Sequence, residues 1–196
     1  VMRYYPTGNL SQVIHNSGAL DFETSARMLE QIGSALDTAH ASNIIHRDIK
    51  PANILLDTAG NAYLGDFGLA EEIESLKSSE NLIGSPAYVP PEVIQAQAPS
   101  HQSDLYSLGF VLFEMLTGRY AFADLSGDSP ISSILDFHLH EPIPDAPTLS
   151  DSVNLVIQRA TAKDPADRYA SGIEMARAFR EAIQADSDDE TEIIFF

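Results

Sequence analysis

The sequence predicts an α+β fold that is mostly α-helical and contains one small β-hairpin. Apolar residues recur with a helical period over residues 21–41, and an almost continuously apolar stretch at 103–116 predicts a buried helix. Between them, turn-forming residues separate two short β-type runs. The chain has 196 residues, of which 44% are hydrophobic and 20% charged, which suits one compact domain and excludes disorder throughout.

The N-terminal part predicts the end of a strand followed by a long helix. Residues 1–5 are β-prone, and Pro6 and Gly8 close them with turn chemistry. The helix over 21–41 has Asp21 as its predicted N-cap. Its apolar face consists of Phe22, Ala26, Leu29, Ile32, Leu36 and Ala39.

The middle of the chain predicts a hairpin and then a long loop. Residues 54–56 and 62–64 are the two strands, and the turn residues at 57–61 join them. No period is sustained over 70–91, which predicts an irregular loop of a length that is usually functional or disordered. After the buried helix at 103–116, shorter helices are predicted at 131–137, 150–161 and 171–185.

Charge and hydropathy narrow the possible partners. The chain has 29 acidic and 11 basic residues, a net charge of −18 that would repel nucleic acid and anionic membranes. The longest apolar stretch, 105–116, is too short for a bilayer, which needs about 20 apolar residues. Because the N-terminus lacks the pattern of a signal peptide, we expect a cytoplasmic location, with any membrane anchor of the full-length protein outside this segment. The acidic segment 186–196 is predicted to be a disordered tail.

The cysteine count is zero, so disulfides, thiolate zinc sites and cysteine nucleophiles are excluded. The histidines outside the motif described next do not have the spacing of a zinc site. We therefore assign no role to His15, His40, His101, His138 and His140.

Three motifs carry the chemistry. They are HRDIKPAN at 46–53, DFG at 66–68 and GSPAYVPPE at 84–92. With these motifs the sequence resembles the eukaryotic-like (Hanks-type) serine/threonine protein kinases, in their bacterial form. The resemblance implies the C-terminal lobe of that fold, with the N-terminal lobe absent. It covers 1–185, with a hinge at 1–9, a catalytic loop at 44–53 and an activation segment at 66–92.

The resemblance implies a role for each motif residue. Asp48 would accept the proton of the substrate hydroxyl, and Lys50 would neutralise the γ-phosphate during transfer. Asn53 and Asp66 would be oxygen ligands of Mg²⁺, which together with ATP is the implied cofactor. Lysine two residues after the aspartate is the serine/threonine-kinase form, so the implied substrates are Ser and Thr hydroxyls of proteins.

The same resemblance implies a nucleotide pocket. Met2 takes the place of the gatekeeper, Arg3 and Tyr5 would offer backbone groups to adenine, and Leu55 would form an apolar floor. Asn9 is also expected at this pocket. Lys50, Asn53 and Asp66 would contact the phosphates.

Further positions are expected to support the site. Glu92 would pair with Arg168, and Asp104 would accept backbone N–H groups of the HRD turn. Ser85 would bridge Asp48 and Lys50. Because an arginine precedes the catalytic aspartate, phosphorylation of the activation segment is expected to order it, with candidate sites at Ser75, Ser78 and Ser79.

A complete kinase also needs a glycine-rich loop, a strand lysine and a helix glutamate. The sequence has no GxGxxG, so we expect a fragment that requires its N-terminal lobe in cis and shows negligible phosphotransfer alone. Two alternatives remain open. One is a pseudokinase or scaffold that only binds, which the intact Asp48, Asn53 and Asp66 disfavour. The other is a small-molecule phosphotransferase, which Lys50 and the activation segment disfavour.

Overall fold

The computed structural model of the chain describes residues 8–66, 86–122 and 131–192. Its α-helices are α1 (Leu10–Ser17), α2 (Phe22–Ala41), α4 (Pro91–Ile94), α5 (His101–Thr117), α6 (Ile131–His140), α7 (Asp151–Ala160) and α8 (Gly172–Glu192). Three short 3₁₀-helices are η1 (Pro51–Asn53), η2 (Pro86–Tyr88) and η3 (Pro165–Asp167), and the two strands are β1 (Ile54–Leu56) and β2 (Ala62–Leu64).

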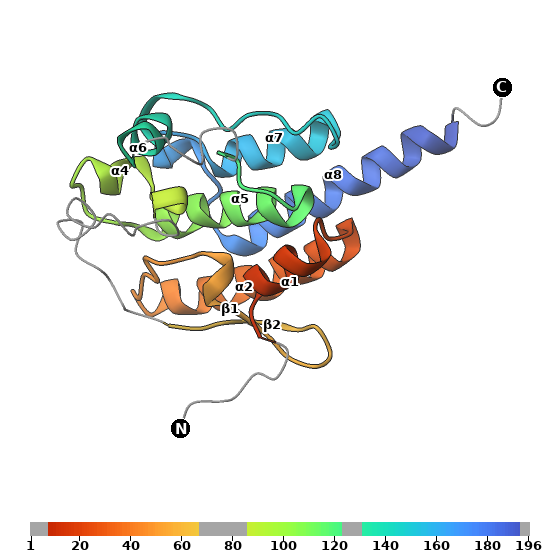
Figure 1. Cartoon of the computed structure of the whole chain (residues 1–196), viewed down its shortest axis with the longest axis horizontal. Coiled ribbons are helices and arrows are strands. Elements are labelled where there is room, and N and C mark those ends of the chain that lie inside the picture. The colour runs from red at the N-terminus through yellow and green to blue at the C-terminus, as the bar shows by residue number, and fades with distance from the viewer. Residues whose placement is uncertain (1–7, 67–85, 123–130, 193–196) are drawn as a thin grey trace.

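Helix α5 is the centre of the fold. Every residue from Ser103 to Leu116 is buried, as the apolar sequence predicted. Figure 1 shows α1, α2 and the hairpin on one side of α5, with α6 and α7 on the other. Helix α8 packs against both α2 and α7 and extends beyond the rest of the molecule (Figure 1). The helices therefore surround one buried helix, and the hairpin packs on α2.

The predictions of the long helix at 21–41 and of the hairpin are confirmed. Helix α2 begins where predicted, because the Asp21 carboxylate accepts the Thr24 N–H at 2.7 Å. Strands β1 and β2 occupy the predicted residues and pair antiparallel, with Ile54 opposite Leu64 and Leu56 opposite Ala62. The fold is thus mostly helical with one two-stranded sheet.

Other elements differ from the sequence prediction. Helix α1 was not predicted, because only Leu10 and Ile14 of it are buried and its start depends on a capping box made by Asn9 and Gln12. The disordered tail predicted from residue 186 was wrong for 186–192, which continue α8. This segment contains no glycine or proline that would end a helix.

Two predictions concern other parts of the chain. The strand end at 1–5 and most of the predicted loop, 70–85, lie outside the described residues. The last part of that loop forms η2 and ends at Pro91, the first residue of α4. None of the helices in the described part of the chain is long and apolar enough to cross a membrane.

Candidate active site

The loop between α2 and β1 brings three of the predicted catalytic residues into contact. The Asn53 amide nitrogen donates to Asp48 Oδ2 at 2.7 Å and to the Asp48 carbonyl at 2.8 Å. Lys50 Nζ lies 2.8 Å from the same Oδ2. Asp48 and Lys50 are part-exposed, so the group is open to a ligand while its geometry is fixed. An acid, a cation and an amide therefore meet at one point on the surface.

A buried carboxylate on α5 fixes the turn before Asp48. Asp104 is 1% exposed, and its Oδ2 and Oδ1 accept the backbone N–H groups of His46 and Arg47, both at 2.8 Å. Arg47 has φ of 70°, a left-handed conformation that costs free energy for a residue with a Cβ. The two hydrogen bonds offset that cost and hold the turn. The expectation that Asp104 accepts backbone N–H groups of the HRD turn is confirmed.

His46 connects the loop between α2 and β1 to the residue that follows β2. Its ring is buried, and Nδ1 lies 3.4 Å from the Asp48 N–H, so Nδ1 is the acceptor. Nε2 then carries the proton and donates to the Gly65 carbonyl at 2.9 Å. Gly65 in turn donates its N–H to the Asn53 carbonyl at 2.8 Å. These bonds place Asp66, the residue after Gly65, beside the loop that carries Asp48.

A second histidine contacts the supporting carboxylate. His40, at the end of α2, has Nε2 at 2.8 Å from Asp104 Oδ2. The His101 ring stacks on the His40 ring with centroids 4.3 Å apart. The sequence assigned neither histidine a role, because the contact joins residues 64 positions apart. Nothing in the local pattern around His40 could have indicated it.

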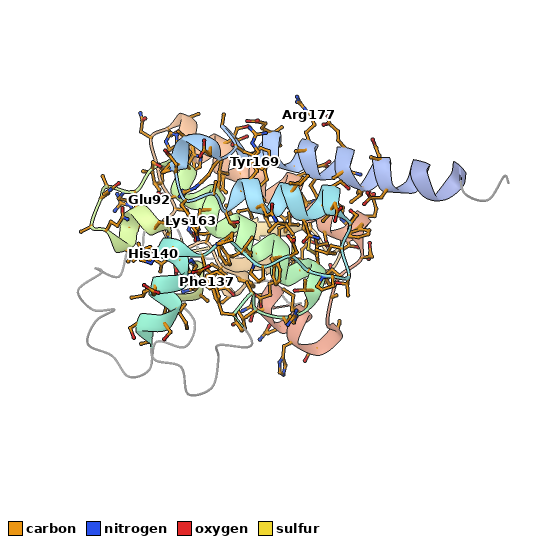
Figure 2. All side chains as sticks on the ribbon, turned by 90° about the horizontal axis from the view of Figure 1, so that it is seen from above. Glu92, Phe137, His140, Lys163, Tyr169 and Arg177 are labelled. Atoms are coloured by element: carbon orange, nitrogen blue, oxygen red, sulfur yellow. The ribbon has the colours of Figure 1, made fainter. Side chains whose placement is uncertain are left out.

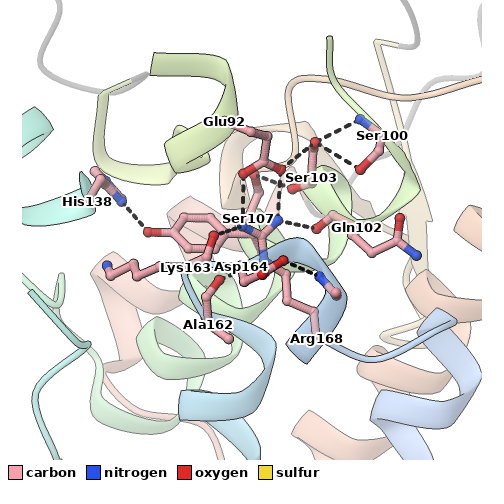
Figure 3. Close-up of polar contacts among 12 residues, drawn as sticks. Glu92, Ser100, Gln102, Ser103, Ser107, His138, Ala162, Lys163, Asp164 and Arg168 are labelled. Carbon is pink, nitrogen blue, oxygen red and sulfur yellow. Dashed lines mark hydrogen bonds and ion pairs between the residues drawn. The ribbon is translucent and has the colours of Figure 1, made fainter. Parts of the chain in front are cut away.

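An ion pair joins α4 to the loop after α7. The Glu92 carboxylate and the Arg168 guanidinium form two hydrogen bonds of 2.8 Å each, and Ser103 donates to Glu92 Oε1 at 2.7 Å (Figure 3). Burial raises the pKa of Glu92, but the hydrogen bonds from Arg168 and Ser103 outweigh it, so the net pKa is lowered. The predicted pair of Glu92 with Arg168 is confirmed.

The sequence model of the protein kinase domain matches residues 1–182 of this chain. The chain belongs to the protein kinase family.

Several bacterial protein kinases are similar to this kinase chain. The serine/threonine-protein kinase PrkC of Bacillus subtilis is 39% identical over 192 residues, which cover 95% of this chain and 29% of that protein. The serine/threonine-protein kinase PknK of Mycobacterium tuberculosis is 37% identical, over 92% of this chain and 16% of its own length. A probable serine/threonine-protein kinase PknB of Lactococcus lactis is 33% identical, over 100% of this chain and 31% of its own. The chain therefore spans less than a third of these curated relatives.

Two expected pocket residues of this kinase chain lie together at the hairpin. Leu55 is half-buried on β1, and a Cβ added at Gly65 would lie 3.1 Å from its side chain, so Leu55 covers the glycine before Asp66. Asn9 forms an isolated antiparallel bridge with Leu55, while its side chain caps α1 by accepting the Gln12 N–H at 3.0 Å. Among the expected residues, Met2, Arg3, Tyr5, Ser75, Ser78, Ser79 and Ser85 lie outside the described residues.

Proposed function

We propose that this chain is the C-terminal lobe of a serine/threonine protein kinase that transfers the γ-phosphate of ATP to Ser and Thr hydroxyls of proteins. The observation that carries the proposal is the contact of Asp48 with Asn53 and Lys50, in a loop held by Asp104. The lobe would cover residues 1–185, with the hinge at 1–9, the catalytic loop at 44–53 and the activation segment at 66–92, followed by the acidic segment 186–196.

Asp48 would orient the hydroxyl of the protein substrate. Its Oδ2 already interacts with Asn53 and Lys50, whereas within the described residues Oδ1 has no hydrogen-bond donor. A hydroxyl can therefore donate to Oδ1 without displacing either partner. Lys50, held at 2.8 Å from Oδ2, places a positive charge next to the point of transfer, where it would neutralise the γ-phosphate.

Asn53 and Asp66 fit a hard divalent cation such as Mg²⁺. Because the Asn53 amide nitrogen donates twice to Asp48, the amide oxygen remains as the ligand atom. Asp66 is exposed, and its backbone has φ of 55°, a conformation that aspartate tolerates better than most residues. Carboxylate and amide oxygens are ligands that Mg²⁺ accepts, and when bound it would neutralise charge on the ATP phosphates.

The nucleotide would lie against the hairpin. Leu55 would form the apolar floor below adenine, next to Asn9, and Arg3 and Tyr5 would offer backbone groups beside the gatekeeper Met2. An N-terminal lobe, in cis, would supply the glycine-rich loop, the strand lysine and the helix glutamate. The 196 residues alone are therefore expected to transfer no measurable phosphate.

The partners of this segment would be proteins that carry Ser or Thr acceptors. With a net charge of −18, nucleic acid and anionic membranes are disfavoured as partners. We propose a cytoplasmic location for this segment.

The test compares the full-length protein with its Asp48→Asn variant in a phosphotransfer assay with ATP, Mg²⁺ and a protein substrate. Loss of the general base predicts a fall in kcat of about 10²–10⁴-fold. Asp136→Asn is the matched control, because its side chain is 72% exposed on α6 and should leave kcat unchanged. Nucleotide binding without transfer by the wild type would support a pseudokinase instead. Transfer only to small molecules would support a small-molecule phosphotransferase.

A further inference from the structure

Gln31 on α2 uses both ends of its side-chain amide to hold the hairpin. Its Oε1 accepts the backbone N–H of Ala62 at 2.7 Å, and its Nε2 donates to Asn61 Oδ1 at 3.0 Å. These contacts join residues 31 and 30 positions apart, so nothing in the local sequence around Gln31 indicates them. Neither the kinase motifs nor the proposed mechanism uses this residue.

The contact with Ala62 takes the place of a strand partner for β2. Ala62 begins β2, is 6% exposed and lies opposite Leu56, but its N–H donates to Gln31 and not to β1. On this side β2 has no neighbouring strand among the described residues, and it packs on α2 instead (Figure 1). A buried backbone N–H needs an acceptor, and the Gln31 amide oxygen supplies it.

The contact with Asn61 connects Gln31 to the turn between the two strands. The Asn61 backbone N–H donates to Asp57 Oδ1 and its Nδ2 donates to Asp57 Oδ2, both at 2.9 Å. The Tyr63 hydroxyl donates to the same Oδ2 at 3.1 Å. Tyr63 lies opposite Leu55 in the strand pair, and Leu55 is the proposed floor below adenine. Gln31 therefore holds a hydrogen-bonded turn that continues into the strands beside the proposed nucleotide pocket.

The other end of β2 leads to Asp66. Gly65, between β2 and Asp66, donates its N–H to the Asn53 carbonyl at 2.8 Å, and its own carbonyl accepts from His46 at 2.9 Å. Strand β2 is thus held at its start by Gln31 and at its end by the loop between α2 and β1. A strand of three residues that is held at both ends has little freedom to slide. The contact at Gln31 therefore contributes to where Asp66 lies.

We propose that Gln31 is a positioning residue for the nucleotide and its metal ion: by holding the start of β2, it sets where Asp66 and Leu55 meet Mg²⁺ and ATP. The proposal rests on the proposed kinase function, which makes Asp66 a ligand of Mg²⁺ and Leu55 the floor below adenine. In this role Gln31 acts through the hairpin and touches neither the nucleotide nor the metal ion.

The expected size of the effect follows from how Gln31 acts. Replacing residues that hold a metal ligand in place typically changes metal affinity or activity by about 10–100-fold. Gln31 does not contact Asp66 directly but holds the opposite end of the strand before it, so we expect the lower end of that range, about tenfold. The effect should fall on the binding of Mg²⁺ and ATP, and not on the binding of protein substrate.

The first test compares steady-state kinetics of the full-length protein and its Gln31→Met variant, which keeps a long unbranched side chain and removes both hydrogen bonds. The KM for ATP and the Mg²⁺ concentration that gives half-maximal activity should each rise about tenfold. The KM for protein substrate should stay within about twofold of the wild type, and so should kcat at saturating Mg²⁺ and ATP. Gln184→Met is the matched control, at an exposed position of α8, the long helix that extends from the molecule in Figure 2, and it should change none of these values.

Two kinetic results would overturn the proposal. One is an unchanged KM for ATP together with an unchanged Mg²⁺ requirement in Gln31→Met. The other is a loss of kcat that saturating Mg²⁺ and ATP do not restore, which would indicate only a structural role. If Gln31→Met does not fold, Asn61→Ala replaces it, since that variant removes the acceptor of Gln31 Nε2 and the side-chain donor to Asp57. It should raise the KM for ATP in the same direction, and an unchanged KM would count equally against the proposal.

Two measurements that need no phosphate transfer separate this proposal from the proposed function. In calorimetric titrations of the full-length protein with Mg²⁺ and ADP, the Kd for ADP should be about tenfold higher in Gln31→Met than in the wild type. Without metal and nucleotide, amide hydrogen exchange of residues 62–64 should be at least about fivefold faster in the variant, while amides of α7 keep their wild-type rates. Both changes in a protein that transfers no phosphate would support the positioning role and refute the kinase function. An unchanged Kd in an active enzyme would refute the positioning role alone.

Discussion

Replacing Arg168 by alanine would test the contacts that hold α4 against the rest of the fold. The guanidinium donates two hydrogen bonds to Glu92 at 2.8 Å. It also donates to the backbone carbonyls of Ala162 at 2.8 Å, Gln102 at 2.9 Å and Lys163 at 3.1 Å. The Arg168 side chain is 0% exposed, so water cannot replace these donors without opening the core.

The magnitude follows from what each substitution leaves behind. Removing one partner of a buried ion pair costs about 3–5 kcal/mol. Arg168→Ala removes the cation that pairs with Glu92, whose carboxylate keeps the Ser103 hydroxyl as a donor, and takes a donor from three backbone carbonyls, so we expect the upper end of that range, about 5 kcal/mol. Glu92→Ala leaves the guanidinium with its three carbonyl partners, so we expect the lower end, about 3 kcal/mol. A domain is stable by only about 5–15 kcal/mol, so Arg168→Ala should be close to unfolding at room temperature.

The assay is urea unfolding followed by far-ultraviolet circular dichroism. Arg180→Ala is the matched control, because its ion pairs with Glu23 and Glu30 lie at the surface and should contribute less than about 1 kcal/mol. The double variant of Glu92 and Arg168 should cost clearly less than the sum of the two single variants. The reasoning would be refuted if Arg168→Ala cost no more than Arg180→Ala, or if the two single costs simply added.

The same pair predicts a pH dependence. The folded-state pKa of Glu92 lies below its ordinary value of 4.5, so between the two values the unfolded state binds more protons. The contribution of Glu92 is therefore complete above pH 4.5 and is lost as the pH falls through the folded-state pKa. In the Glu92→Ala variant, the unfolding free energy should decline less on acidification below pH 4.5 than in the wild type.

Two further variants test packing and burial. Gly33→Ala would place a Cβ 2.7 Å from the backbone of Gly172, where α2 crosses α8, and should lower the unfolding free energy by about 1–3 kcal/mol. Ser34→Ala, at an exposed position of the same helix, is the control and should not lower it. Equal effects of the two variants would contradict the close crossing. His138 has a pKa of about 3 when folded and 6.5 when exposed, so the unfolded state binds more protons between these values and stability falls as the pH drops below 6.5. Between pH 7 and pH 5 the unfolding free energy of the wild type should therefore fall by about 2 kcal/mol through this residue, and His138→Gln should lack this loss. Identical losses in both proteins would show that the ring is not buried in its neutral form.

Some of the fold was predictable from the sequence because its causes are local. The apolar period of α2, its cap at Asp21 and the turn residues of the hairpin all act over a few positions. Helix α1 was missed because it buries only two residues and depends on Asn9, whose capping role looks the same in sequence as a turn. The extension of α8 beyond residue 185 was missed because the acidic composition of 186–196 predicted disorder, although the segment contains no glycine or proline that would end a helix.

The candidate site, like the fold, was predictable from the sequence only in part. The resemblance to the kinase family implied that Asp48, Lys50, Asn53 and Asp66 belong to one site, and that Asp104 and the Glu92–Arg168 pair support it. What the resemblance did not give is which atom contacts which. The amide nitrogen of Asn53 is directed to Asp48, so its oxygen is the ligand atom, and His46 links the loop to Gly65.

The sequence by itself determined α2, the buried helix α5, the hairpin and the acidic net charge, and its motifs named the candidate site residues, since composition and patterns among residues close in the chain carry this information. Only the tertiary structure decided that His40 shares the carboxylate of Asp104, and that His138 enters an aromatic pocket with one nitrogen unpaired among the described residues. The physical reason is that these contacts join residues from different helices. Their hydrogen bonds exist only once packing around α5 has removed water and fixed the distances.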